Sequence, residues 1–152
     1  MAWTYAEIAA AYKALSPVPA SLADAAETLK AQTVPAVLDI TTAAIDSVIV
    51  PTGEAYAITA LGAKPLSGAS PPTPEDQVII AAWNVNRMLT QLTTIATSIP
   101  AVLAPVQAAL SGLQSAGVLS AASAAAILAL INVQVPKWQP PIAAGDLQTA
   151  GV

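Results

Sequence analysis

The feature that most constrains this chain is its shortage of charge. Residues 88–136 form a run of 49 positions without a formally charged side chain. Charged residues make up 9% of the sequence and hydrophobic residues 55%, against roughly 25% and 45–50% in typical soluble domains. Charges keep an ordinary surface hydrated and apart from its neighbours, because desolvating an ion is costly. The composition therefore predicts a protein that keeps much of its surface against other proteins.

Several classes of function are disfavoured by what the sequence lacks. The net charge is −4 and no cluster of Lys and Arg is present, which argues against nucleic-acid binding, since phosphate contacts dominate that affinity. The chain has no histidine and no cysteine, so it contains neither a Ser-His-Asp triad nor a thiolate metal site. No Gly-rich phosphate loop is present. We expect no enzymatic activity, no catalytic residue, no cofactor and no metal site.

Proline and glycine divide the alanine-rich sequence into short segments, which predicts several short helices with firm ends. The patterns Thr4-x-x-Glu7 and Ser21-x-x-Asp24 are typical of helix starts. The acid pairs Asp24 with Glu27 and Glu75 with Asp76 lie at predicted helix starts, where cap and dipole stabilisation explain them without acid-base catalysis. Further helices are expected over residues 51–61, 98–116 and 120–131.

The longest predicted helix follows the strong start at Thr73, where proline occupies the first helical position. Its apolar residues repeat at alternating steps of four and three, the spacing of left-handed helix packing. These residues are Val78, Ala82, Val85, Leu89, Leu92, Ala96 and Ile99. The spacing predicts that this helix is the centre of the fold.

One stretch, residues 37–50, supports two interpretations. Its β-branched residues favour a strand, whereas the spacing of Ile45, Val48 and Ile49 suits a helix. We favour a helix that is capped near Asp39 or Thr41 and leave the strand open.

These patterns together predict an all-α fold, a small bundle of five or six short helices with an extended Pro-rich C-terminal arm. The expected organisation is an N-terminal helical segment over residues 1–62, a Pro/Gly/Ser linker over 63–73, a C-terminal helical segment over 74–132 in the same domain, and an extended tail over 133–152.

The candidate interaction residues lie near the chain ends. Trp3 and Trp138 are the aromatic anchors that such ends often place in a partner's pocket. Val133 and Val135 lie in the extended segment up to Pro141, which can pack as an arm across a neighbouring subunit. The alternatives are that both tryptophans fold back over their own core and that the arm is a solvated tail.

The uncharged run also admits a membrane hairpin. Pro100, Pro105 and Gly117 interrupt it, and polar Thr and Gln residues are scattered through it. No window therefore offers the roughly 20 predominantly apolar residues of a spanning helix. An uncharged helical bundle is favoured over a membrane protein.

Part of the sequence resembles a known group of proteins. Between Ser98 and Trp138 it reads Ser-Ile-Pro-Ala-Val, Leu-Gln-Ser-Ala-Gly-Val-Leu-Ser, Ala-Ile-Leu-Ala-Leu and Val-Pro-Lys-Trp. With the opening Tyr-Ala-Glu-Ile and the stretch Ala-Glu-Thr-Leu-Lys-Ala-Gln-Thr-Val, this order resembles small Ala-rich structural and accessory proteins of tailed bacteriophage virions. The resemblance implies a helical component at the tail tip, at the fibre attachment or decorating the capsid, and it transfers no site residue. The Pro-rich linker near residues 63–74 departs from the compact form.

We therefore expect a non-enzymatic structural protein of a phage virion that assembles through uncharged helix faces and terminal arms. Its partners would be copies of itself and other virion proteins, with no nucleic acid. The N-terminus lacks the pattern of a secretory signal, so we expect synthesis in the host cytoplasm and a final place in the virion. Two alternatives stay open, a small holin-like membrane-active protein and a helical adaptor that binds one protein partner.

Overall fold

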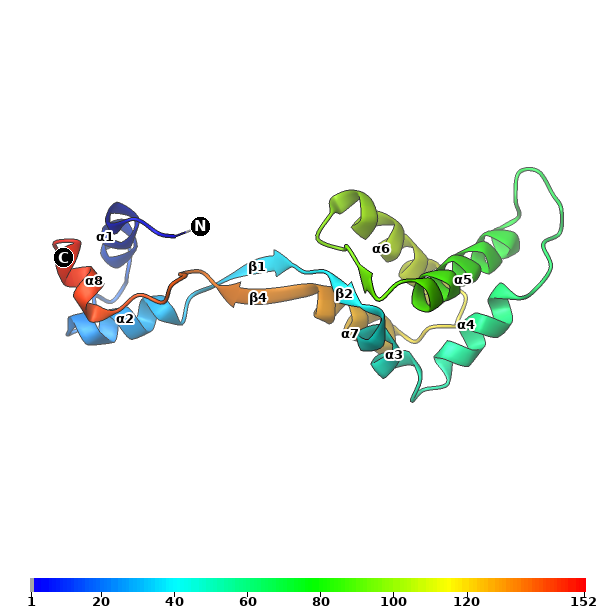
Figure 1. Ribbon diagram of the computed structural model, residues 1–152, viewed down its shortest axis with the longest axis horizontal. Helices are drawn as coiled ribbons and strands as arrows, with labels where there is room; N and C mark the ends of the chain where they lie inside the picture. Colours follow the sequence, from blue (N-terminus) through cyan, green and yellow to red (C-terminus); the bar gives the residue numbers. More distant parts are fainter. Residues whose placement is uncertain (1) are drawn as a thin grey trace. The chain divides into compact units, whose positions relative to one another are not determined.

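The structure, a computed structural model, describes residues 2–152 and divides the chain into two compact units (Figure 1). Unit 1 combines the two chain ends, up to residue 36 and from 134 onward, and unit 2 comprises residues 37–133. Helices account for 57% of the residues and strands for 9%. The fold is therefore helix-rich, as predicted, but two small sheets keep it from being purely α.

Unit 1 is built from three helices, α1 (Tyr5–Lys13), α2 (Leu22–Lys30) and α8 (Ala144–Thr149). The capping box predicted at Thr4 is present, because the Thr4 amide donates to the Glu7 carboxylate at 2.7 Å. Ser21 likewise accepts from the Asp24 amide at 3.1 Å at the start of α2. The core residues of unit 1 are Ile8, Ala25, Ala26, Leu29, Trp138, Ile142 and Leu147.

The C-terminal part of unit 1 differs from the extended tail that the sequence predicts over residues 133–152. Only β4 (Asn132–Pro136) is a strand. Bends follow over residues 137–140, and residues 144–149 form α8. Ile142 and Leu147 are buried against α1 and α2, so apolar burial explains why this end folds back. Pro136, Pro140 and Pro141 favour an extended chain just before this short helix, so the sequence pattern there does not indicate a helix.

Strand β1 (Thr33–Val37) pairs with β4 in a two-stranded sheet, so segments from the two ends of the sequence meet. The Thr33 hydroxyl donates to the Gln134 side-chain oxygen at 3.2 Å. Beside the strands, the Lys137 amide donates to the Gln32 carbonyl at 2.9 Å. The chain leaves unit 1 through β1 and returns to it through β4.

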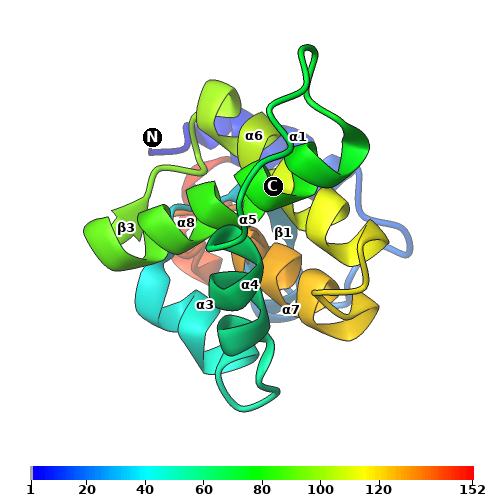
Figure 2. The ribbon, with the colours of Figure 1, turned by 90° about the vertical axis from the view of Figure 1, so that its right-hand side faces the viewer.

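Unit 2 contains five helices and a second small sheet around one core (Figure 2). The elements are β2 (Ile40–Thr41), α3 (Thr42–Ile49), α4 (Glu54–Gly62), α5 (Pro74–Gln91), β3 (Thr94–Ile95), α6 (Pro100–Ser115) and α7 (Ala121–Ile131). Strand β2 runs antiparallel to β3, with Ile40 opposite Ile95. Both isoleucines are buried, so this short sheet contributes directly to the core.

The ambiguous stretch 37–50 contains both structures that its residues suggested. It begins with the last residue of β1 and with β2, and it continues as α3, whose N-cap Thr41 accepts from the Ala44 amide at 3.2 Å. The cap predicted near Asp39 or Thr41 is therefore found at Thr41. The strand signal and the helix signal were both real and belonged to successive segments.

Helix α5 has the predicted cap at Thr73 but is shorter than its apolar repeat. It ends at Gln91, so Leu92, Ala96 and Ile99 lie beyond it. Leu92 is extended, with φ −111° and ψ 151°, and its carbonyl accepts from the Thr42 hydroxyl at 3.0 Å. Pairing of β3 with β2 takes the chain out of the helix there. A periodic pattern alone does not reveal such a competing strand.

The segment predicted as a linker is an exposed loop that Asp76 ties to the start of α5. The Asp76 carboxylate accepts hydrogen bonds from the Ser67 amide at 2.8 Å, from the Ser67 hydroxyl, and from the Thr73 amide and hydroxyl at 3.0 and 2.9 Å. The Ser67 bonds, above all, hold the pKa of Asp76 well below its usual range. The loop is thus fixed near its middle, at Ser67, although residues 63–72 are exposed.

Two glycines give a matched test of helix packing. A Cβ at Gly62 would lie 2.9 Å from the backbone of Trp83, whereas a Cβ at Gly112 in α6 meets nothing within 4 Å. We expect Gly62→Ala to lower the free energy of unfolding by about 1–3 kcal/mol through overpacking of α4 on α5. Gly112→Ala should raise it by about 0.5–1 kcal/mol, because it removes a mid-helix glycine. Urea denaturation of both variants measures this, and equal effects would contradict the close approach.

The tie at Asp76 gives a second prediction. Asp76→Ala removes the acceptor for Ser67 and Thr73, so we expect limited proteolysis to cut within residues 63–73 several-fold faster than in the unchanged chain. Glu75→Ala is the matched control, since it removes an exposed acid from the same helical turn. Equal cleavage of the two variants would show that the loop does not depend on Asp76.

Candidate functional site

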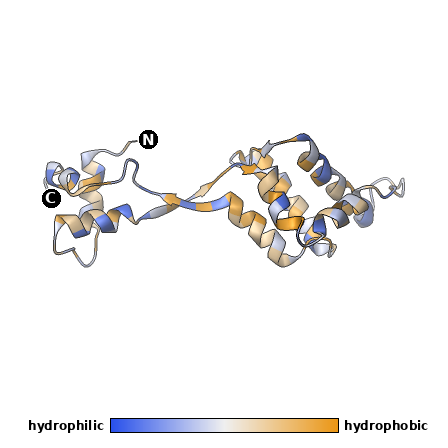
Figure 3. Cartoon of the chain, turned by 60° about the horizontal axis from the view of Figure 1, so that its bottom comes forward, coloured by the Kyte–Doolittle hydropathy of each residue, from blue (hydrophilic) through white to orange (hydrophobic). Residues whose placement is uncertain are grey.

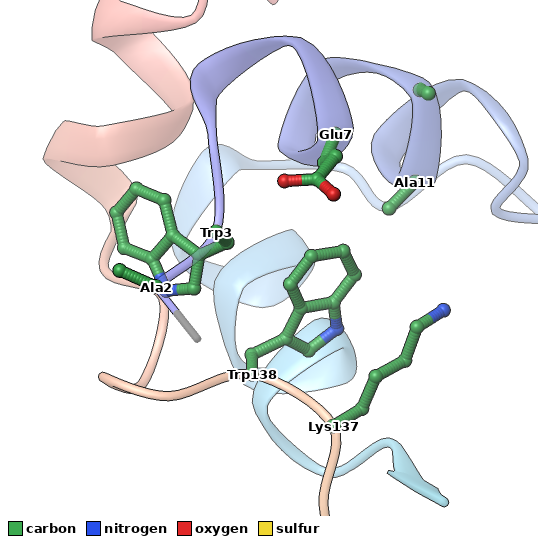
Figure 4. Close-up of a pocket in the computed structure, with 7 residues that line it drawn as sticks. Ala2, Trp3, Glu7, Ala11, Lys137 and Trp138 are labelled. Carbon is green, nitrogen blue, oxygen red and sulfur yellow. The ribbon is translucent and has the colours of Figure 1, made fainter.

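Two of the residues singled out from the sequence, Trp3 and Trp138, line the same pocket on unit 1 (Figure 4). The pocket lies between α1 and the segment that follows β4, and its volume is about 440 Å³. Its lining consists of Ala2, Trp3, Glu7, Ala10, Ala11, Lys137 and Trp138. Folding thus brings aromatic residues from the two ends of the sequence together at one site.

Trp138 is part of the core and of the pocket at the same time. Its side chain is buried, and its indole Nε1 donates to the Gln32 side-chain oxygen at 3.1 Å. The Lys137 ammonium lies 4.9 Å from the centre of its ring, within the range of a cation–π contact. The expectation that the tryptophans fold back over their own core therefore holds for Trp138.

Trp3 is half-buried at the opposite side of the pocket. Its Nε1 donates to the Pro140 carbonyl at 2.5 Å, and its ring meets Tyr5 edge-on with 5.9 Å between ring centroids. The indole N–H groups of Trp3 and Trp138 are therefore both hydrogen-bonded within the protein. Trp138 is buried and Lys137 lies over its ring, so the indole surface that stays open at the pocket is that of the half-buried Trp3.

Glu7 supplies a negative charge at this pocket. Hydrogen bonds from the Thr4 backbone and then from its side chain lower the pKa of Glu7. Both bonds end on Oε2, at 2.7 and 2.9 Å, and Oε1 takes part in no hydrogen bond within residues 2–152. Figure 4 shows the carboxylate near both indoles, with the Lys137 side chain beside Trp138. The site thus combines apolar ring surface with one group of each charge.

The other two predicted residues, Val133 and Val135, do not line this pocket. Both are half-buried in β4, where they alternate with the exposed Asn132, Gln134 and Pro136. The structure therefore separates the four residues into a Trp pocket and a strand. Glu7 and Lys137 are pocket residues that sequence reasoning missed, although Lys137 precedes Trp138 and Glu7 follows Trp3 by four residues.

A second pocket, of about 390 Å³, lies on unit 2 beside α5. It is lined by Gly62, Lys64, Leu66, Ile79, Ile80 and Trp83. Trp83 is 49% exposed, and the Arg87 guanidinium lies 4.9 Å from the centre of its ring. Trp83 and Arg87 lie one helical turn apart on α5 and outside its apolar repeat. This spacing is the sequence feature that could have indicated an exposed aromatic site.

The exposed faces of α6 and α7 are the third feature relevant to binding. Every exposed side chain on these two helices is small, apolar or neutral. On α6 these include Ala101, Ala104, Pro105, Ala108 and Ser111. Figure 3 colours every residue by hydropathy, buried and exposed alike, and shows hydrophobic colour on parts of the unit 2 helices. The uncharged run of the sequence thus becomes an uncharged surface.

Within residues 2–152, no helix is both long and apolar enough to cross a membrane. The same residues contain no group of three or more acidic side chains placed to share a metal ion. No known protein family, no curated protein and no solved structure matches the chain significantly.

Trp138 belongs both to the core of unit 1 and to the pocket lining, and its core role gives a third prediction. We expect Trp138→Ala to lower the stability of unit 1 by about 3–5 kcal/mol, because it empties a buried aromatic site. Trp3→Ala should cost less, since Trp3 is half-buried. Hydrogen exchange of the amides in α1, α2 and α8 measures the effect, with the amides of α5 as internal control. Equal protection in both variants would contradict the core role of Trp138.

Proposed function

We propose that this chain is a non-enzymatic structural subunit of a tailed-phage virion, which assembles through protein–protein contacts with copies of itself and with other virion proteins. The observation that carries the proposal is the uncharged exposed surface of α6 and α7. Neutral and apolar groups are buried between subunits at a smaller desolvation cost than ions. A surface of this kind is suited to permanent contact.

Large apolar side chains elsewhere on the surface support the same proposal. Tyr56 is 80% exposed, and four aliphatic residues in the turns and loops between elements are half exposed or more. These aliphatic residues are Val18, Val50, Leu66 and Ile99. Single exposed apolar residues are ordinary, but together with so few charges they leave little to keep copies apart.

The adaptor alternative, in which a partner binds beside the apolar repeat of α5, has less support. Ala82 and Val85 from that repeat are buried within unit 2, where they pack against α3, α4, α6 and α7 as part of one core. The repeat is therefore already occupied by the chain itself. A partner would have to use other residues of α5, such as the exposed Trp83.

The test is the molar mass of the full chain in detergent-free buffer, by multi-angle light scattering across a dilution series. We expect an oligomer of fixed stoichiometry or a larger particle. A monomer that persists at high concentration would contradict the proposal, and recovery only with detergent would favour the membrane-active alternative.

A variant locates the contact on α6. Ala108→Glu places a charge on the exposed α6 face, and burying it should weaken assembly about ten-fold or more. Gln77→Glu is the matched control, because it adds the same charge to an exposed position of α5. Equal dissociation of the two variants would show that net charge, not the α6 face, controls assembly.

A further inference from the structure

We propose that a pocket on unit 2 binds a small amphiphilic carboxylate, an apolar molecule with one anionic end such as a medium-chain fatty acid. This Trp83 pocket is the hollow of about 390 Å³ lined by Gly62, Lys64, Leu66, Ile79, Ile80 and Trp83. The inference goes beyond the proposed function, because it needs neither a second copy of the chain nor a virion. It is carried by unpaired hydrogen-bond donors around an apolar hollow.

The wall of the Trp83 pocket is mostly apolar. Leu66 is 52% exposed and Trp83 49% exposed, and Ile80 is half-buried beside them in the lining. A hollow of this size, with an apolar lining and a few polar groups, is typical of small-molecule sites. Covering these side chains removes apolar surface from water, which favours binding. The body of the ligand is therefore apolar.

Trp83 differs from the other two tryptophans in its indole N–H group. The N–H groups of Trp3 and Trp138 are bonded to Pro140 and Gln32. The indole N–H of Trp83 makes no hydrogen bond to any group of residues 2–152, and the residue stays about half exposed although Arg87 lies over its ring. Trp83 therefore offers both open ring surface and a free donor.

Both positive charges of unit 2 lie at this pocket. Lys64 and Arg87 are the only basic residues between positions 37 and 133. The first lines the pocket, and the guanidinium of the second lies 4.9 Å from the centre of the Trp83 ring. In the described chain the one ion pair joins Lys30 to Glu27. Lys64 and Arg87 are therefore free to pair with an anion.

The acids beside the pocket do not neutralise these cations. No acidic residue belongs to the lining. The buried Asp76 carboxylate accepts from Ser67 and Thr73, and Glu75 borders a separate hollow with Lys64 but forms no ion pair with it. The side chains at the pocket thus supply donors and no acceptor. A carboxylate suits them, because charge-assisted hydrogen bonds are shorter and stronger than neutral ones.

The pocket is formed before a ligand arrives. A Cβ at Gly62 would lie 2.9 Å from the backbone of Trp83, so the end of α4 lies directly against α5. On the other side, the Asp76 carboxylate holds the amide and hydroxyl of Ser67, the residue after Leu66. Both restraints reduce the ordering that binding would require.

Four probes that differ in one part each test the ligand class. Equilibrium dialysis of the full chain, which works in any oligomeric state, measures the affinity for octanoate, octanol, octylammonium and acetate. We expect octanoate to bind at least about five-fold tighter than octanol, and octylammonium to bind more weakly than octanol. Acetate should not bind detectably, because it buries almost no apolar surface. Equal affinities for octanoate and octanol, or for octanoate and acetate, would overturn the inference.

Two surface variants test the cations without disturbing the core. Lys64→Gln and Arg87→Gln each change an exposed side chain, and each should lower the affinity for octanoate about two- to five-fold. The affinity for octanol should stay the same, which a merely structural role would not predict. Lys13→Gln is the matched control, since it removes the same charge from an exposed position of α1. An equal effect of the control, or a parallel loss of octanol binding, would overturn the inference.

A photoreactive octanoate with a diazirine at its tail locates the site in the unchanged chain. We expect the cross-link, mapped by mass spectrometry, within residues 62–66 or 79–83, and we expect excess octanoate to suppress it. Label confined to unit 1, or to the exposed faces of α6 and α7, would overturn the assignment to the Trp83 pocket.

Vesicles distinguish a free acid from a lipid head group. Sedimentation with phosphatidylglycerol vesicles in a chain that does not bind free octanoate would overturn the inference in favour of a lipid surface. The light-scattering test of assembly is independent of these results. A chain that assembles and binds no octanoate would keep the proposed function and lose this site.

Discussion

Hydrogen bonds from backbone amides to carboxylates hold this structure together at the places where its helices begin. Glu7, Asp76 and Asp146 accept from the amide of their own N-cap residue, at 2.7 to 3.0 Å. Two further acids accept from amides that are distant in the sequence. Asp39 accepts from the Ser98 amide at 3.0 Å, ahead of α6. Glu54 accepts from the Ser120 amide at 2.6 Å, at the start of α7. A chain of many short helices has many unpaired amides, and each needs an acceptor.

This use of the acids has an electrostatic consequence. Burial raises the pKa of Glu54, but hydrogen bonds from Ser123, Ser120 and Thr52 outweigh it and lower that pKa to about 2. The pKa of Asp39 is lowered by the Ser98 hydroxyl and amide. Such carboxylates stabilise the fold above their ordinary pKa, and that contribution is lost as the pH falls through the lowered one. With most of its acids at helix starts and few bases, the chain has little charge left for the faces of α6 and α7.

The proposed function follows from that distribution of charge, not from any catalytic arrangement. The neutral faces of α6 and α7 are the part of the surface that a neighbouring subunit would cover at the smallest desolvation cost. Trp138 links the core of unit 1 to its surface, because the buried ring also lines the pocket. A contact made there would be sensitive to the packing of both chain ends.

The sequence by itself determined the local elements. The caps at Thr4, Ser21, Thr73 and Ser120 and the helices they begin were predictable, because a cap needs only residues within one turn. Tertiary structure decided the rest: the pairing of β1 with β4, the end of α5 at the β2–β3 sheet, the helix α8 and the meeting of Trp3 with Trp138. These features join residues far apart in the chain, and their energy comes from burial and pairing that no local pattern encodes.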